Sequence, residues 1–389
     1  MAHLPGFGIR LIRKGKAVVA NLIEDAKSLP PVPGESSDSY HKNKNTLLEH
    51  VNTSMESHAG IHELIGSGDL SVMFDNHRNH VNFMDTVFLL NNFELLARIL
   101  PWVYRVYPAR GFSHDYFPLA MHSWIAAVGE VIGARPGAPI VEIYRWIISR
   151  HEQLIALSGE SEYAGLPFGM NSETEARLSN FISLLVRGDH RECLSIATSM
   201  VGDPADVEKL YLSLLQPAMN RIGQLWETNK ISVAQEHLAS SIVTRVMAVV
   251  FSGIGPAGKK MGRAVIAASP NEYHEIGPWM ISDILEMNGW EVRYLGANVQ
   301  PDELQGLLES FRPHTLALSV TMPFNLPRAV DIIAGIRKNE ALRNIKIMVG
   351  GASFNALPDL YKTVGADGYA GDAREALRLA AGWFEDIRE

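Results

Sequence analysis

The spacing of apolar residues changes along this chain near residue 262. Before that point, apolar positions recur every three or four residues, which is the spacing of one face of a helix. After it, short runs typical of β-strands alternate with helical segments. This alternation predicts a doubly wound, five-stranded parallel sheet with helices on both faces. The runs lie at 263–269, 290–296, 314–320, 345–351 and 367–371.

The helical part of the sequence divides into two blocks. Residues 29–46 (LPPVPGESSDSYHKNKNT) are rich in proline, serine and charge, so we predict an N-terminal segment and linker over 1–49. A helical domain is predicted over 50–158. After a glycine-rich stretch, a four-helix bundle is predicted over 173–255, directly before a sheet domain over 260–389. The expected fold class is therefore α/β plus all-α.

Composition and charge narrow the class of protein. The chain has 389 residues, of which 47% are apolar and 20% charged, as in ordinary globular domains. A net charge of −8 argues against a broad nucleic-acid-binding surface. We find no DNA-recognition helix and no apolar run near the ~20 residues of a membrane span. The single cysteine, Cys193, cannot form an intrachain disulfide, and a cytoplasmic location is expected.

Polar residues follow the first predicted strand, at the edge where open α/β sheets bind ligands. The stretch NEYHEIG contains Glu272, His274 and Gly277. Imidazole is a good neutral metal ligand, and a carboxylate beside its other nitrogen fixes the tautomer. Glycine allows a flat ligand to approach the backbone. Taken alone, however, this E-x-H-x-x-G motif more often marks a histidine on a solvent-facing loop.

Two further strand ends carry small or polar residues. Ser319 and Thr321 end the third strand and, as alternate residues, can share a face. Gly350 and Gly351 end the fourth strand, where we expect them to leave a groove. Ordinary strand-to-helix turns explain either feature separately. Their occurrence at successive strand ends favours a single binding site.

Together these features resemble the cobalamin-binding domain of methionine synthase and its relatives, which has a flavodoxin-like, Rossmann-like fold. In that family a histidine at the position of His274 displaces the dimethylbenzimidazole base and ligates cobalt from below. The nucleotide tail then runs past the serine, the threonine and the glycine pair. The family usually has aspartate where this chain has Glu272, whose longer side chain can still reach His274. The resemblance covers 173–389, because family members carry a four-helix bundle before the sheet.

The bundle contains a second motif, W-x9-E-H, formed by Trp226, Glu236 and His237. It resembles the signature of light-dependent adenosylcobalamin regulators, whose bundle covers the upper face of the cofactor. An indole is a broad, flat lid for the adenosyl group, and a carboxylate accepts hydrogen bonds from ribose hydroxyls. His237 is a donor for the upper cobalt position after photolysis. The alternative reading of Trp226 and His237 is a core aromatic residue with a polar neighbour.

The N-terminal domain is rich in aromatic residues and histidines, including His77 and His80 three residues apart. One hypothesis is a pocket for a second planar pigment, a bilin or a haem, with a histidine donor. This domain has no cysteine for a thioether-linked bilin. We favour the other hypothesis, a helical sensor-partner or dimerisation domain with surface histidines.

The leading hypothesis is a cobalamin-dependent photoreceptor or signalling protein rather than an enzyme, with no catalytic residue assigned. Light would cleave the cobalt–carbon bond of adenosylcobalamin, and the bundle would shift. Contacts within a homo-oligomer or with a regulatory protein partner would then change. One alternative is a corrinoid methyl-carrier protein of a methyltransferase system. Another is an interaction protein that has lost the corrin.

Overall fold

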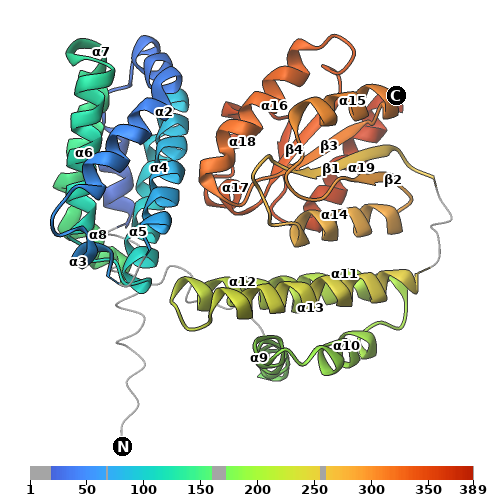
Figure 1. Ribbon diagram of the computed structural model, residues 1–389. Coiled ribbons are helices and arrows are strands. Elements are labelled where there is room, and N and C mark those ends of the chain that lie inside the picture. The colour runs from blue at the N-terminus through green and yellow to red at the C-terminus, as the bar shows by residue number, and fades with distance from the viewer. Residues whose placement is uncertain (1–18, 67–68, 160–171, 255–259, 389) are drawn as a thin grey trace, which may run out of the picture. The chain divides into compact units, whose positions relative to one another are not determined.

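The computed structural model describes residues 19–66, 69–159, 172–254 and 260–388 (Figure 1). The chain folds as two compact units. The first consists mainly of the helices before residue 166, and the second contains most of the bundle and the sheet. No helix in these described ranges has the length and apolar character needed to cross a membrane.

The first unit packs its helices around large aromatic side chains. The hydroxyl groups of Tyr40 and Tyr144 lie 3.0 Å apart in the core, and the ring of Trp124 is stacked parallel to that of Tyr144. All three side chains are almost fully buried. After a helical stretch at 19–27, the helices are α2 (Gly34–Glu56), α3 (Ile61–Ile65), α4 (Leu70–Leu90), α5 (Phe93–Ala109), α6 (Tyr116–Val131), α7 (Ala134–Ser149) and α8 (His151–Ser158).

The linker predicted over 29–46 is wrong for most of its length, because α2 begins at Gly34. The prediction rested on proline and serine content, but Pro33 only precedes the first turn of the helix. Ser36 and Ser37 are small side chains buried at helical spacing with Tyr40. Buried serines give this helix a composition that is also typical of linkers. Composition alone therefore predicted the wrong structure for this segment.

His77 is not the surface residue that we expected. Its side chain is 2% exposed. Its Nδ1 lies 2.7 Å from Oδ1 of Asn52, and its Nε2 lies 2.8 Å from the hydroxyl of Tyr116. Burial lowers its pKa to about 4, so the ring is neutral at physiological pH.

The bundle of the second unit has the four predicted helices. Asp203 caps the long third helix together with Asp206, and Pro204 occupies its first position, as the sequence indicated. A π-helical turn, Tyr211–Leu215, interrupts this helix. The bundle consists of α9 (Ser172–Arg187), α10 (His190–Ser199), α11 (Pro204–Leu210), α12 (Gln216–Glu227) and α13 (Val233–Ser252).

The sheet is parallel, with strand order β2-β1-β3-β4-β5, which confirms the predicted flavodoxin-like fold. Its central strands are buried on both faces, as their continuous apolar runs require. Helices α14 and α19 cover one face, while α15 and α16 lie on the other (Figure 1). The elements are β1 (Arg263–Ala268), α14 (Ile276–Met287), β2 (Glu291–Tyr294), α15 (Pro301–Phe311), β3 (Thr315–Ser319), α16 (Leu326–Lys338), β4 (Lys346–Gly350), α17 (Ala352–Ala356), α18 (Leu360–Thr363), β5 (Gly368–Tyr369) and α19 (Ala373–Arg388).

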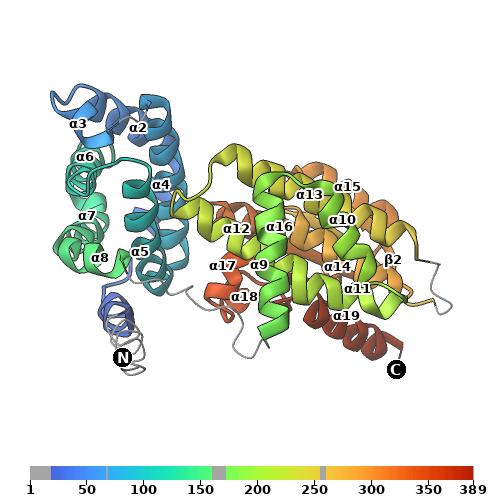
Figure 2. The ribbon, with the colours of Figure 1, turned by 90° about the horizontal axis from the view of Figure 1, so that it is seen from below.

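The bundle packs against α14 (Figure 2). The two share one hydrophobic core that includes Met280 and Ile284. A buried polar contact lies in the same junction. The Tyr211 hydroxyl donates to Oδ2 of Asp283 at 2.5 Å, and the Trp279 indole donates to Oδ1 at 3.1 Å. This junction fixes the bundle beside the helix that follows the His274 loop.

Candidate functional site

The predicted site residues lie at the carboxyl edge of the sheet. Ala268 of β1 is in register with Ser319 of β3, which is in register with Gly350 of β4. The chain leaves β1 toward β2 on one side and reaches β3 on the other, so the gap between β1 and β3 is a topological switch point. Open α/β sheets bind ligands at such points.

Two asparagines shape the loop that carries His274. Asn271 and Asn298 both have left-handed backbone conformations, with φ of 61° and 53°, which asparagine tolerates better than most residues. The Asn298 side-chain oxygen accepts a hydrogen bond from the Asn271 backbone at 2.9 Å. The Asn298 backbone donates to the carbonyl oxygen of Glu272 at 3.0 Å. The loop after β1 is thereby tied to the loop after β2.

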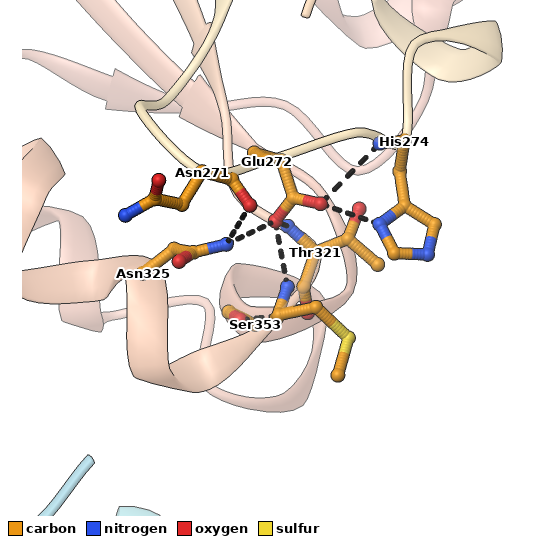
Figure 3. A network of polar contacts seen from close by, with 7 residues as sticks. Asn271, Glu272, His274, Thr321, Asn325 and Ser353 are labelled. Carbon is orange, nitrogen blue, oxygen red and sulfur yellow. Dashed lines mark hydrogen bonds and ion pairs between the residues drawn. The ribbon is translucent and has the colours of Figure 1, made fainter. Parts of the chain in front are cut away.

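Glu272 is fully buried at the centre of this site (Figure 3). Its Oε2 accepts hydrogen bonds from the backbone of Thr321 and of Met322, both at 2.9 Å, and from the side-chain amide of Asn325 at 3.2 Å. Its Oε1 contacts Nδ1 of His274. Three donors therefore hold one carboxylate oxygen, and the other is directed at the histidine. A glutamate fits where the family usually has aspartate.

The imidazole of His274 is presented to solvent by this buried carboxylate. Its side chain is 57% exposed, whereas that of Glu272 is 0% exposed. An ionised carboxylate only accepts hydrogen bonds, so Nδ1 carries the proton. The lone pair of Nε2 is then available to a metal, and the carboxylate increases its donor strength.

The electrostatics of the pair are consistent with this assignment. Burial opposes the ionisation of Glu272, but the hydrogen bonds from His274, Met322 and Asn325 outweigh it and lower the carboxyl pKa. Burial also opposes a charge on His274, yet the contact with Glu272 raises the pKa of the imidazole. The charge of Glu236 on α13 raises that pKa further. The beginning of α13 therefore lies within electrostatic range of the His274 loop.

Glu236 also holds the neighbouring histidine of the bundle. Its Oε2 lies 2.7 Å from Nδ1 of His237, and its Oε1 accepts a hydrogen bond from the Ser240 hydroxyl at 2.7 Å. The His237 side chain is 74% exposed. The described part of the second unit thus carries two carboxylate–histidine pairs, one on the sheet and one on the bundle. In each pair, Nδ1 faces the carboxylate and Nε2 remains for another partner.

Three other predicted residues are Trp226, Gly277 and Thr321. Trp226, near the end of α12, is partly buried and packs against the bundle core, so its role as a lid stays a prediction. Gly277, in the first turn of α14, has open space where a side chain would begin, as expected where a flat ligand approaches. Thr321 contributes its backbone N–H to Glu272.

The glycine pair does not form the expected groove. A Cβ on Gly350 would lie 2.8 Å from the carbonyl oxygen of Ala370, and one on Gly351 would lie 2.5 Å from that of Val320. Gly351 also has φ of 93°, a region that L side chains rarely adopt. Neighbouring backbone fills the space, so these glycines are required for close packing of the strand ends.

Two residues of the site were not found from the sequence. Asn325 is 2% exposed and joins Glu272 to the loop after β3, and Ser269 is buried just after β1. The Ser269 hydroxyl has no partner among the described residues. No sequence signal distinguishes a buried asparagine from an exposed one in a P-F-N turn. Only the pairing of the strand ends brings Asn325 to the carboxylate.

The fold and the contact between the buried Glu272 and the exposed His274 define a sheet domain that presents a histidine donor beside a helical bundle. Comparisons with known proteins agree with this class. Residues 262–380 match a family described as the B12 binding domain, and residues 178–250 match a second B12 binding domain family, so the bundle and the sheet are both covered.

Similar curated proteins establish the family. Dimethylamine corrinoid protein 3 of Methanosarcina mazei is 30% identical over 165 residues, which are 42% of this chain and 97% of that protein. Dimethylamine corrinoid protein 1 of Methanosarcina acetivorans is 28% identical over 180 residues, 46% of this chain and 82% of that protein. This chain belongs to the family of B12-binding corrinoid proteins, and it binds a corrinoid.

A regulator is also among the similar proteins. The HTH-type transcriptional repressor CarA of Myxococcus xanthus is 30% identical over 148 residues, 38% of this chain and 48% of the repressor. Among solved structures, the monomethylamine corrinoid protein of Methanosarcina barkeri is 18% identical with a TM-score of 0.48, covering 54% of this chain and 99% of that protein. Both matched families lie outside the N-terminal helical unit.

Proposed function

We propose that His274 is the lower ligand of the corrinoid cobalt and that the protein serves as a methyl-group carrier. The observation that carries the first part is the buried Glu272 carboxylate, which holds Nδ1 of an exposed imidazole and leaves Nε2 available. Such a pair orients the ring and raises its donor strength before any metal arrives. A histidine on an ordinary surface loop does not need a buried carboxylate with three other donors.

The residues around the pair fit a large ligand with a polar tail. The buried Ser269 hydroxyl has no partner among the described residues and follows the same strand as the His274 loop. A polar tail that enters the sheet edge offers it the hydrogen bond that burial otherwise denies. The open space at Gly277 leaves room for a flat ring beside the backbone. These two features support a corrinoid seated on the carboxyl edge.

The carrier role is supported by the relatives, several of which are dimethylamine corrinoid proteins. When bound, cobalt supplies a site that accepts and releases a methyl group. The protein would hold the ring through His274 and keep the hydrogen bond from His274 to Glu272 intact. A proton on Nδ1 of His274 would remain shared with the Glu272 carboxylate.

A second function, a light-responsive adenosylcobalamin regulator, is favoured by the Glu236–His237 pair. A methyl carrier has no need of a second oriented imidazole beside the bound ring. A regulator would use Trp226 to cover the adenosyl group and His237 as a nitrogen donor to cobalt once that group is lost. The similarity to the repressor CarA supports this alternative.

One experiment separates the two functions. Purified full-length protein is loaded in the dark with adenosylcobalamin or with methylcobalamin, and its visible spectrum and oligomeric size are measured before and after illumination. A carrier retains the methyl form and transfers its methyl group to a thiol acceptor when a methyltransferase is supplied. A regulator prefers the adenosyl form, and light changes both its spectrum and its size. Retention of neither form would overturn both functions.

Matched variants assign the two histidines. His274→Ala should remove histidine ligation from below, so an unchanged dark spectrum would contradict the assignment of His274. His237→Ala should leave the dark spectrum unchanged and alter only the spectrum after light, if the regulator is correct. A carrier should show the same spectra with and without His237. The two substitutions therefore serve as controls for each other.

A further inference from the structure

The N-terminal helical unit contains a cavity of about 50 Å³ that is lined by residues of that unit alone. It lies among α4, α5 and α6, with one residue from α7. The wall is mainly apolar and aromatic, and none of its lining residues is Asp, Glu, Lys or Arg. Its polar side chains include Asn76, His77 and His80, which lie on one face of α4 at helical spacing.

His80 is the group that gives this cavity its chemistry. Both ring nitrogens of His77 already have partners, in Asn52 and Tyr116. In contrast, Nε2 of His80 is buried and has no hydrogen-bond partner among the described residues. The ring packs against Trp124, with 5.1 Å between ring centroids. A buried polar atom without a partner is costly in a finished structure, and a bound molecule or an ordered water removes that cost.

The charge state of His80 restricts the charge that a ligand of this cavity can carry. Burial lowers its pKa to about 3, and the neighbouring His77 lowers it as well. The ring is therefore neutral at physiological pH and offers one donor or acceptor, but no charge. An ionic ligand would lose its hydration in this apolar wall without gaining an opposite charge.

We propose that this cavity binds a small neutral molecule with an apolar body and a single hydrogen-bonding group, which contacts Nε2 of His80. A water molecule needs about 10–15 Å³ of such space, and a cavity of about 150 Å³ holds benzene. The volume of 50 Å³ therefore suits a molecule of a few non-hydrogen atoms. A bilin or a haem, considered from the sequence, is far too large for this cavity.

The test uses the full chain with methionine methyl groups labelled with ¹³C. Met84 and Met121 both line the cavity, so their methyl signals report directly on its contents. Propan-2-ol is the probe, and propan-2-amine, which is charged at neutral pH, is its matched control of the same shape. We expect saturable shifts at both methionines with the alcohol, together with nuclear Overhauser contacts to its methyl groups, and neither with the amine.

Three variants locate the binding. Ala120 lines the cavity, so Ala120→Val should fill it and abolish the shifts, whereas Ala126→Val, at an exposed position of the same helix, should leave them intact. His80→Leu should weaken the alcohol about tenfold while xenon still binds. Shifts that stay linear in alcohol concentration and are equal at all methionines would come from the solvent alone. They would leave an ordered water as the only occupant of the cavity and would overturn the proposal. So would equal binding of the amine, or binding that survives Ala120→Val.

Discussion

Substitution of Asp283 by asparagine should remove a loss of stability at high pH that arises at the junction of bundle and sheet. Asp283 is 2% exposed, and it accepts hydrogen bonds from Tyr211 of the bundle and from Trp279 of its own helix. Burial, together with the nearby charge of Glu286, raises its pKa from 3.8 to about 7 despite these donors. Asparagine has the same shape and never carries a charge.

The size of this stability change follows from the linkage between the protonation of Asp283 and folding. Between about pH 4 and pH 7 the folded protein holds a proton on Asp283 that the unfolded chain has lost, so stability falls as pH rises through this window. One pKa unit corresponds to about 1.4 kcal/mol, so the loss at pH 8 is of the order of 4 kcal/mol. The Asp283→Asn variant should be free of this term and more stable than wild type at pH 8.

The assay is hydrogen exchange of the backbone amides in α14 and in the Tyr211–Leu215 turn, at pH 5 and pH 8, corrected for intrinsic exchange rates. Wild type should open more readily at pH 8, whereas Asp283→Asn should show equal opening free energies at the two pH values. Tyr211→Phe is the matched control, since it removes one donor, costs about 1–3 kcal/mol and keeps the pH dependence. Equal protection of wild-type α14 at both pH values would refute the reasoning.

Three further predictions concern the corrinoid site. Asn325→Ala removes a donor from Glu272, so the corrinoid should dissociate about tenfold faster, as seen in stopped-flow absorbance; an unchanged rate would deny Asn325 a positioning role. Gly351→Ala should destabilise the sheet by about 2 kcal/mol or more in urea unfolding because its Cβ meets backbone, whereas Gly277→Ala should leave stability unchanged and weaken corrinoid binding. Trp226→Ala should weaken the preference for adenosylcobalamin over methylcobalamin in equilibrium titrations; equal preferences in variant and wild type would count against the lid.

Much of the second unit was predictable because its pattern is local. The five predicted runs become β1 to β5 within one or two residues at each end. The central strands β1, β3 and β4 were the clearest, since a strand buried on both faces must be apolar. The cap at Asp203 was readable for a similar reason, because all its partners lie within one helical turn. The same local reasoning failed at 34–46, where buried serines in a helix imitate a linker.

The sequence by itself determined the order of strands and helices, the histidine at the end of the first strand and the resemblance to corrinoid-binding domains. Tertiary structure alone decided that Glu272 is buried, and that its carboxylate meets the backbone of Thr321 and the amide of Asn325. These partners lie about 50 residues away along the chain. Periodicity reports which face of an element is buried, but a hydrogen bond between loops depends on strand register and on the close packing of glycines, which exist only in the folded chain.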